Sequence, residues 1–146
     1  QGVKAVMDLK LSSQGKDFVF TCVSMGNPHA ITFIDTPVKD FAVDYYGPSL
    51  ETDPAFPKKT NVEFVEFVDE THLNMRVWER GSGETWACGT GTCATVVAAN
   101  LLGKCPRVPV DVKLLGGTLT IEWSEKDNHV YMTGPATFVF DGVWNE

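Results

Sequence analysis

Cys88 and the glycines that follow it are the residues of this sequence best suited to chemistry. They lie directly before a small, apolar stretch, in the run Ala87-Cys88-Gly89-Thr90-Gly91-Thr92. The first turn of a helix leaves backbone N–H groups without intrahelical partners and carries partial positive charge, so it favours anions. Two anions fit here: a substrate carboxylate held by the N–H groups near Gly89 and Gly91, and the Cys88 thiolate. We therefore expect the helix terminus to lower the pKa of Cys88 from about 8.5 toward neutrality.

The other three cysteines are predicted to be inert packing residues. Cys22 falls inside an apolar strand pattern, Cys93 inside the apolar stretch, and Cys105 in a turn before proline. The cysteines form no Cys-x-x-Cys pair, so the sequence predicts no metal site. A chain this long and this apolar needs no disulfides, and we expect reduced thiols.

A second polar group, Glu79-Arg80, closes a predicted strand. Strand alternation places Glu79 on the inward face, where a carboxylate requires a cationic partner. That partner is either Arg76 or Arg80 in an ion pair, or the ammonium group of a ligand. The segments 26–29 and 60–61 are, taken alone, typical of turns.

Apolar and polar residues alternate in several segments of the chain with the period of half-buried strands. Such patterns, or short apolar runs, occur at 3–11, 18–23, 30–34, 62–68, 73–77, 108–114, 119–123, 130–132 and 138–140. Residues 43–50 form a predicted short surface helix. Residues 92–102 are apolar on every side and stop at Gly103, a good left-handed cap, so this second helix must be buried. We predict an α+β domain with many strands around one central helix.

Length and composition indicate one domain over residues 1–146, since 146 residues that are 43% hydrophobic suffice for one ordinary core. The net charge of −7 is spread without any Lys/Arg cluster, which argues against nucleic acid and anionic membranes as partners. No apolar stretch approaches the ~18 residues of a spanning helix, and no signal peptide is present, so we expect a cytoplasmic protein. The chain begins at Gln1 rather than Met, and we expect sequence to be missing upstream.

Five motifs, in order, resemble the C-terminal half of the diaminopimelate epimerase family. They are MGNPHAITF (25–33), FPKKTNVEFV (56–65), RVWERGSGETWACGTGTCA (76–94), GGTLTIEW (116–123) and MTGPATFVFDG (132–142). The block at 76–94 is the most specific, and the five together span nearly the whole chain. The resemblance implies a diaminopimelate epimerase-like fold, with a mixed, mostly antiparallel sheet wrapped as a barrel around the central helix.

The resemblance also implies an isomerase of lysine and peptidoglycan biosynthesis that interconverts LL- and meso-diaminopimelate without pyridoxal phosphate or another cofactor. In this family one cysteine thiolate removes the α-proton, and a second cysteine, as a thiol, returns a proton from the opposite face. Cys88 matches one of these two cysteines. Gly89 and Thr90 match groups that hold the α-carboxylate, with Thr90 standing where the family often has Ser. Further substrate-binding positions are matched by Asn27, Asn61, Glu79 and Arg80, and His29 matches a residue behind them.

The family's other catalytic cysteine belongs to an N-terminal half with a Cys-Gly-Asn-Gly-type motif, which this sequence lacks. We therefore expect a single C-terminal domain that is inactive alone. Its expected partners are diaminopimelate and the missing half, and the sequence also allows a homodimer. Two alternatives remain open. One is a proline or hydroxyproline racemase-like isomerase, against which Asn61, Glu79 and Arg80 argue; the other is a non-catalytic binding domain, against which the retained Cys88 argues.

Overall fold

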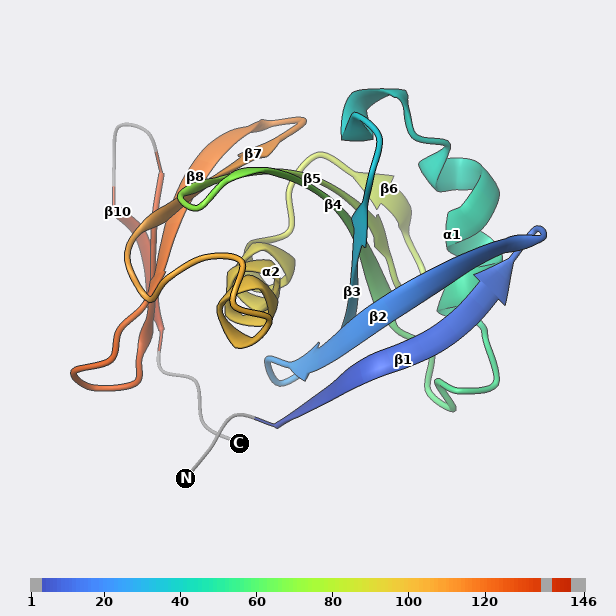
Figure 1. Ribbon diagram of the computed structural model, residues 1–146, viewed down its shortest axis with the longest axis horizontal. Helices are drawn as coiled ribbons and strands as arrows, with labels where there is room; N and C mark the ends of the chain where they lie inside the picture. Colours follow the sequence, from blue (N-terminus) through green and yellow to red (C-terminus); the bar gives the residue numbers. More distant parts are fainter. Residues whose placement is uncertain (1–3, 135–137, 143–146) are drawn as a thin grey trace.

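One mixed sheet of ten strands forms the framework of the computed structural model, which describes residues 4–134 and 138–142 (Figure 1). Its order is β1-β2-β3-β4-β5-β7-β8-β9-β10, with β6 paired to β5. The strands are β1 (Ala5–Ser13), β2 (Lys16–Ser24), β3 (Pro28–Ile34), β4 (Asn61–Asp69), β5 (His72–Glu79), β6 (Gly83–Thr85), β7 (Val110–Leu114), β8 (Gly117–Trp123), β9 (Val130–Thr133) and β10 (Phe138–Gly142). Among the described strands only β3–β4 and β5–β7 pair in parallel, so the predicted α+β class with a mixed, mostly antiparallel sheet is confirmed.

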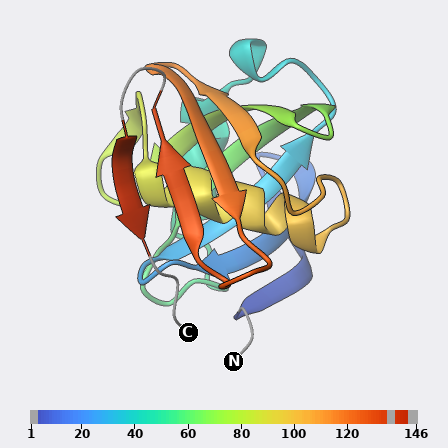
Figure 2. The ribbon, with the colours of Figure 1, turned by 90° about the vertical axis from the view of Figure 1, so that its left-hand side faces the viewer.

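Helix α2 (Gly89–Leu101) occupies the concave side of the sheet, which arches over it in Figure 1. Figure 2 shows the C-terminal strands passing in front of the same helix. Residues 91–99 are all buried, as a helix without a polar face requires. The helix is followed by Gly103 with a φ of 74°, which confirms the predicted left-handed cap. Within the described ranges, no helix has both the length and the apolarity to cross a membrane.

The sheet curls around α2 but does not close, so the expected barrel is wrong. Along the path of paired strands, β1 and β10 are the two ends, and each pairs with one neighbour in the described part of the chain. A register shift between Val6 and Leu9, where Asp8 has a φ of 58°, interrupts the regular alternation of inward and outward side chains along β1. Met7 is exposed, although the sequence pattern predicts it on the buried face, whereas Val6 is exposed as that pattern predicts. Closure needs hydrogen bonds between the first and last strands, and among the described residues β1 and β10 do not pair with each other.

The outer face of the sheet carries helix α1 (Val43–Glu51), which confirms the predicted short surface helix. It covers a second core, whose buried members are Phe18, Phe20, Ala30, Val38, Val43, Leu50, Val62 and Phe64. Glu51 of this helix binds the end of β5 through two hydrogen bonds. Its Oε1 accepts from Trp78 Nε1 at 2.9 Å, and its Oε2 accepts from the Gly81 N–H at 2.9 Å. The turn that contains Arg80 is therefore fixed by α1, a segment distant in sequence.

Candidate active site

The residues predicted to do chemistry meet where β3 and β4 begin, β5 ends and α2 begins. Because β3 and β4 are parallel, His29 pairs with Asn61 at their common start. Strand β5 runs antiparallel to β4, so Glu79 lies at this same end of the sheet. The start of α2 is joined to it by a hydrogen bond of 3.5 Å from Asn27 Nδ2 to Thr90 Oγ1. Four separate segments of the chain thus contribute to one site.

Cys88 lies at the start of the buried helix, as the sequence predicts, and is its N-cap residue because α2 begins at Gly89, three residues before the predicted stretch 92–102. Its Sγ accepts a hydrogen bond from the Gly91 N–H at 3.3 Å and lies 3.8 Å from Thr90 Oγ1. Its carbonyl oxygen accepts from Thr92 Oγ1 at 2.7 Å, which closes the first turn. The sulfur is therefore held in one position at the mouth of the helix, half-buried rather than inside the core.

The pKa of Cys88 is raised, so the expectation of a lowered value is wrong. Burial of the thiol is the largest cause, and the nearby Glu63 carboxylate adds to it. The Gly91 N–H and the Thr90 hydroxyl act in the opposite direction, by hydrogen bonding to the sulfur. The helix terminus does favour the thiolate, but desolvation and a neighbouring acid outweigh it. Cys88 consequently rests as a thiol at neutral pH.

Glu63 is a residue of this site that was not predicted from the sequence. Its side chain is fully buried on the α2 face of β4, and its Oε2 lies 2.8 Å from His29 Nδ1. A Cβ at Gly91 would lie 2.5 Å from Glu63 Oε2 and 3.0 Å from Cys88 Sγ. The missing side chain of Gly91 therefore lets the carboxyl group and the sulfur approach the same point. A charged residue inside the apolar run Val62-Glu63-Phe64-Val65 was the available signal.

Hydrogen bonds connect Glu63 to the start of α2. From His29, whose Nδ1 faces Glu63, Nε2 lies 3.2 Å from Asn27 Oδ1. Asn27 then donates to Thr90 Oγ1, the group beside Cys88 Sγ. The structure thus brings together Asn27, His29, Cys88, Gly89 and Thr90, all of which the sequence analysis names.

Asn61 and Arg80 are arranged differently from Asn27. The Asn61 side chain is engaged with backbone: Nδ2 donates to the Pro28 carbonyl at 3.0 Å, and Oδ1 accepts from the Arg80 N–H at 2.7 Å. It therefore clamps the start of β3 to the turn after β5. Arg80 itself is exposed and donates from Nη1 to the Lys58 carbonyl at 3.3 Å.

Glu79 is half-buried, and its Oε2 accepts from Thr85 Oγ1 at 2.5 Å. Arg76 pairs instead with Glu84, at 2.6 Å. Among the described residues no ion pair joins Glu79 to either arginine, so that explanation of its charge is wrong. The ammonium group of a ligand remains the predicted partner of Glu79.

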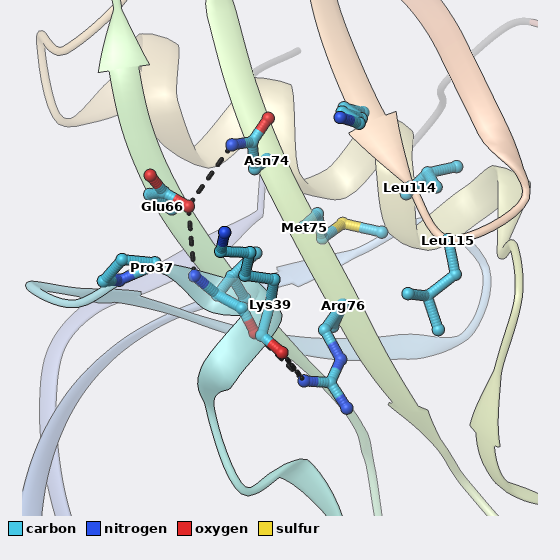
Figure 3. Close-up of a pocket in the computed structure, with 10 residues that line it drawn as sticks. Pro37, Lys39, Glu66, Asn74, Met75, Arg76, Leu114 and Leu115 are labelled. Carbon is cyan, nitrogen blue, oxygen red and sulfur yellow. Dashed lines mark hydrogen bonds between the residues drawn. The ribbon is translucent and has the colours of Figure 1, made fainter.

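A separate hollow of about 450 Å³ lies away from Cys88, between the turn after β3, strands β4 and β5, and the β7–β8 turn (Figure 3). Its polar lining comes from the sheet face opposite α2. There Glu66 accepts from the Val38 N–H and from Asn74, while Arg76 donates to the Val38 carbonyl. These groups are satisfied by one another.

Comparison with known proteins identifies the family. A model of the diaminopimelate epimerase family matches residues 21–139. The chain belongs to the diaminopimelate epimerase family. A diaminopimelate epimerase from Methanococcus maripaludis strain C5 is 58% identical over 137 residues, which are 94% of this chain and 49% of that protein. One from Acetivibrio thermocellus is 59% identical over 128 residues, covering 88% of this chain and 45% of that protein.

The chain thus spans about half the length of the curated diaminopimelate epimerases it matches. Among solved structures, a phenazine biosynthesis protein of the PhzF family from Bacillus anthracis superposes with a TM-score of 0.53 at 17% identity. The match covers 89% of this chain and 38% of that one. At that identity the likeness shows a shared fold alone. The family match favours a diaminopimelate epimerase over the proline racemase-like alternative.

Gly91 and Gly89 offer a matched pair of substitutions at the start of α2. Gly91→Ala would press its methyl group against Glu63 and Cys88, and we expect it to lower the free energy of unfolding by about 1–3 kcal/mol. Gly89→Ala would meet only the flexible end of Met132, at 3.2 Å, and should stay within about 1 kcal/mol of the parent. Urea unfolding measures both. Equal stability of the two variants would contradict the close approach at Gly91.

Alkylation by iodoacetamide tests the raised pKa of Cys88. A raised pKa leaves less thiolate at neutral pH, so Cys88 should react more slowly than a small free thiol there and accelerate as the pH rises. It should still react before Cys22 and Cys93, because burial raises the pKa of these thiols to about 11 and about 12. Peptide mass spectrometry after timed alkylation gives each rate. A Cys88 that outpaces a free thiol at neutral pH would reverse this assignment.

Proposed function

We propose that this chain forms one wall of a cofactor-independent epimerase site that interconverts LL- and meso-diaminopimelate, with Cys88 as one of two acid/base thiols. The observation that carries the proposal is the position of Cys88 Sγ at the N-terminus of α2, where it accepts the Gly91 N–H beside Thr90. Membership of the diaminopimelate epimerase family supports the substrate. The opposite wall, with the second cysteine, is assigned to the half of the relatives that this chain does not match.

Inversion at an α-carbon requires a base on one face and an acid on the other. The thiolate on one side takes the α-proton and becomes a thiol, while the electron pair stays on the α-carbon and is stabilised by the carboxylate. The thiol on the far side then gives its proton to that carbon and becomes a thiolate. Since burial favours the protonated form of Cys88, this thiol is suited to begin as the acid.

The carboxylate of the substrate would bind at the first turn of α2. The N–H groups of Gly89 and Thr90 have no intrahelical acceptor, and the helix dipole favours an anion there. Glu79 and Arg80 supply opposite charges at the end of β5 for the distal amino and carboxylate groups of diaminopimelate. Asn61 contributes through Arg80, whose backbone it holds.

Restoring the missing half tests this proposal directly. In deuterated water, we expect the chain alone to catalyse no measurable exchange of the diaminopimelate α-proton, because one proton relay is absent. A fusion with the N-terminal half of the Methanococcus maripaludis strain C5 enzyme, 58% identical in the matched region, should restore exchange visible by proton NMR. Turnover by the isolated chain would refute the half-site, and an inactive but folded fusion would count against the function.

Two cysteine variants of that fusion identify the thiol. Cys88→Ala should abolish turnover, since removing an acid/base group costs about 10²-fold or more. Cys93→Ala should keep turnover but lower the stability of the fold, because the Cys93 side chain lies on α2 and is buried in the hydrophobic core. The reverse pattern would show that the wrong thiol has been assigned.

A further inference from the structure

Glu63 is a fully buried acid that the proposed proton transfer does not use. Its Oε2 has one partner, His29 Nδ1, and its Oε1 is buried without a hydrogen-bond partner among the described residues. A carboxylate with so few donors pays a large desolvation cost, and a buried acid usually keeps its proton instead. Burial accordingly raises the pKa of Glu63, against the opposing effect of His29.

The titratable groups around Glu63 come from every element that packs on it. They are Cys22 on β2, His29 on β3, Glu79 on β5 and Cys88 at the start of α2. Only His29 can offset a negative charge on Glu63. Glu79 is an acid, and the two thiols become negative when they ionise. Ionised Glu63 would therefore sit among groups that disfavour it.

The hydrogen-bond chain from Glu63 to Cys88 has a direction, which follows from its donors and acceptors. Asn27 donates its amide N–H to Thr90, which turns its Oδ1 toward His29 Nε2. An oxygen can only accept, so Nε2 carries a proton. One more proton must then lie between His29 Nδ1 and Glu63 Oε2, whichever atom holds it, and the pair is neutral. In this arrangement Thr90 accepts from Asn27, and its own hydroxyl hydrogen is free for Cys88 Sγ.

Loss of the shared proton would reverse the direction of each hydrogen bond between His29 and Thr90. His29 would donate from Nδ1 to the Glu63 carboxylate, and its Nε2 would become an acceptor. The Asn27 amide would turn over to donate to that nitrogen, leaving its oxygen toward Thr90. The Thr90 hydroxyl would then donate to Asn27, and Cys88 would lose a donor.

We propose that Glu63 is a positioning residue of the Cys88 site: the proton it shares with His29 directs the Thr90 hydroxyl hydrogen toward the Cys88 sulfur. The thiolate gains a hydrogen bond in this way and is spared a negative charge behind it. This inference rests on the proposed acid/base role of Cys88, because only then does the stability of the thiolate matter for turnover.

Glu63→Gln tests the proposal in the chain as it stands. The glutamine amide donates to His29 Nδ1 and does not ionise. The hydrogen bonds from residue 63 to Cys88 therefore keep the same direction at all pH values. We expect Cys88 to be alkylated about three to ten times faster at mildly alkaline pH, equivalent to about half to one pKa unit. Glu66→Gln is the matched control, since Glu66 lies on the same strand but faces away from α2, and it should leave the rate unchanged.

The Thr90 hydroxyl separates a relayed effect from simple charge removal. In a Thr90→Val background the gain from Glu63→Gln should be smaller, because the relay has lost its last member. An equal gain with and without the hydroxyl would overturn the proposal, as would no gain at all or an equal gain from Glu66→Gln.

Nitrogen NMR of the unmodified chain gives a second readout that depends on no variant's folding. We expect His29 Nε2 to carry a proton at neutral pH, and an unprotonated Nε2 would overturn the proposal. Neither readout uses diaminopimelate. If both come out as expected but the fusion does not turn over, the epimerase assignment fails and the role of Glu63 stands. If the fusion turns over but Glu63→Gln does not change the alkylation rate of Cys88, the epimerase assignment stands and the role of Glu63 fails.

Discussion

The burial of helix α2 on all sides is the constraint on which the rest of this structure depends. Its residues 91–99 have no polar face, so the sheet must curl around them, and the polar start of the helix is left where several strands end. Gly91 is essential to this arrangement. Any side chain there would meet the Glu63 carboxyl group and the Cys88 sulfur, so the helix could not approach β4 as closely.

The same geometry sets the electrostatics of the thiol. A helix N-terminus stabilises an anion, but only against the cost of removing that anion from water. At Cys88 the cost of burial prevails, although two hydrogen-bond donors oppose it. An acid/base thiol has use for such a balance, because it must be both a proton donor and a proton acceptor within one cycle.

Much of the fold could be predicted from sequence because its signals are local. Alternation located strands such as the one around Met75, a short apolar run located the one around Phe64, and an all-apolar pattern ending at Gly103 located α2. Strand β6 went unpredicted because three residues are too few to show a period. The barrel was wrong because closure depends on two strands at opposite ends of the chain, and no local pattern reports whether they meet.

The site divides in the same way. The sequence by itself determined that Cys88 begins a buried helix, since the glycines, the thiol and the apolar run are adjacent in the chain. The tertiary structure alone decided what surrounds that thiol. Glu63, His29 and Asn27 come from other segments of the chain, and Asn61 is turned toward backbone. Burial of the thiol raises the pKa of Cys88, against the expected direction. The physical reason is that a helix terminus acts along its own segment, whereas desolvation and charge depend on everything packed against the group.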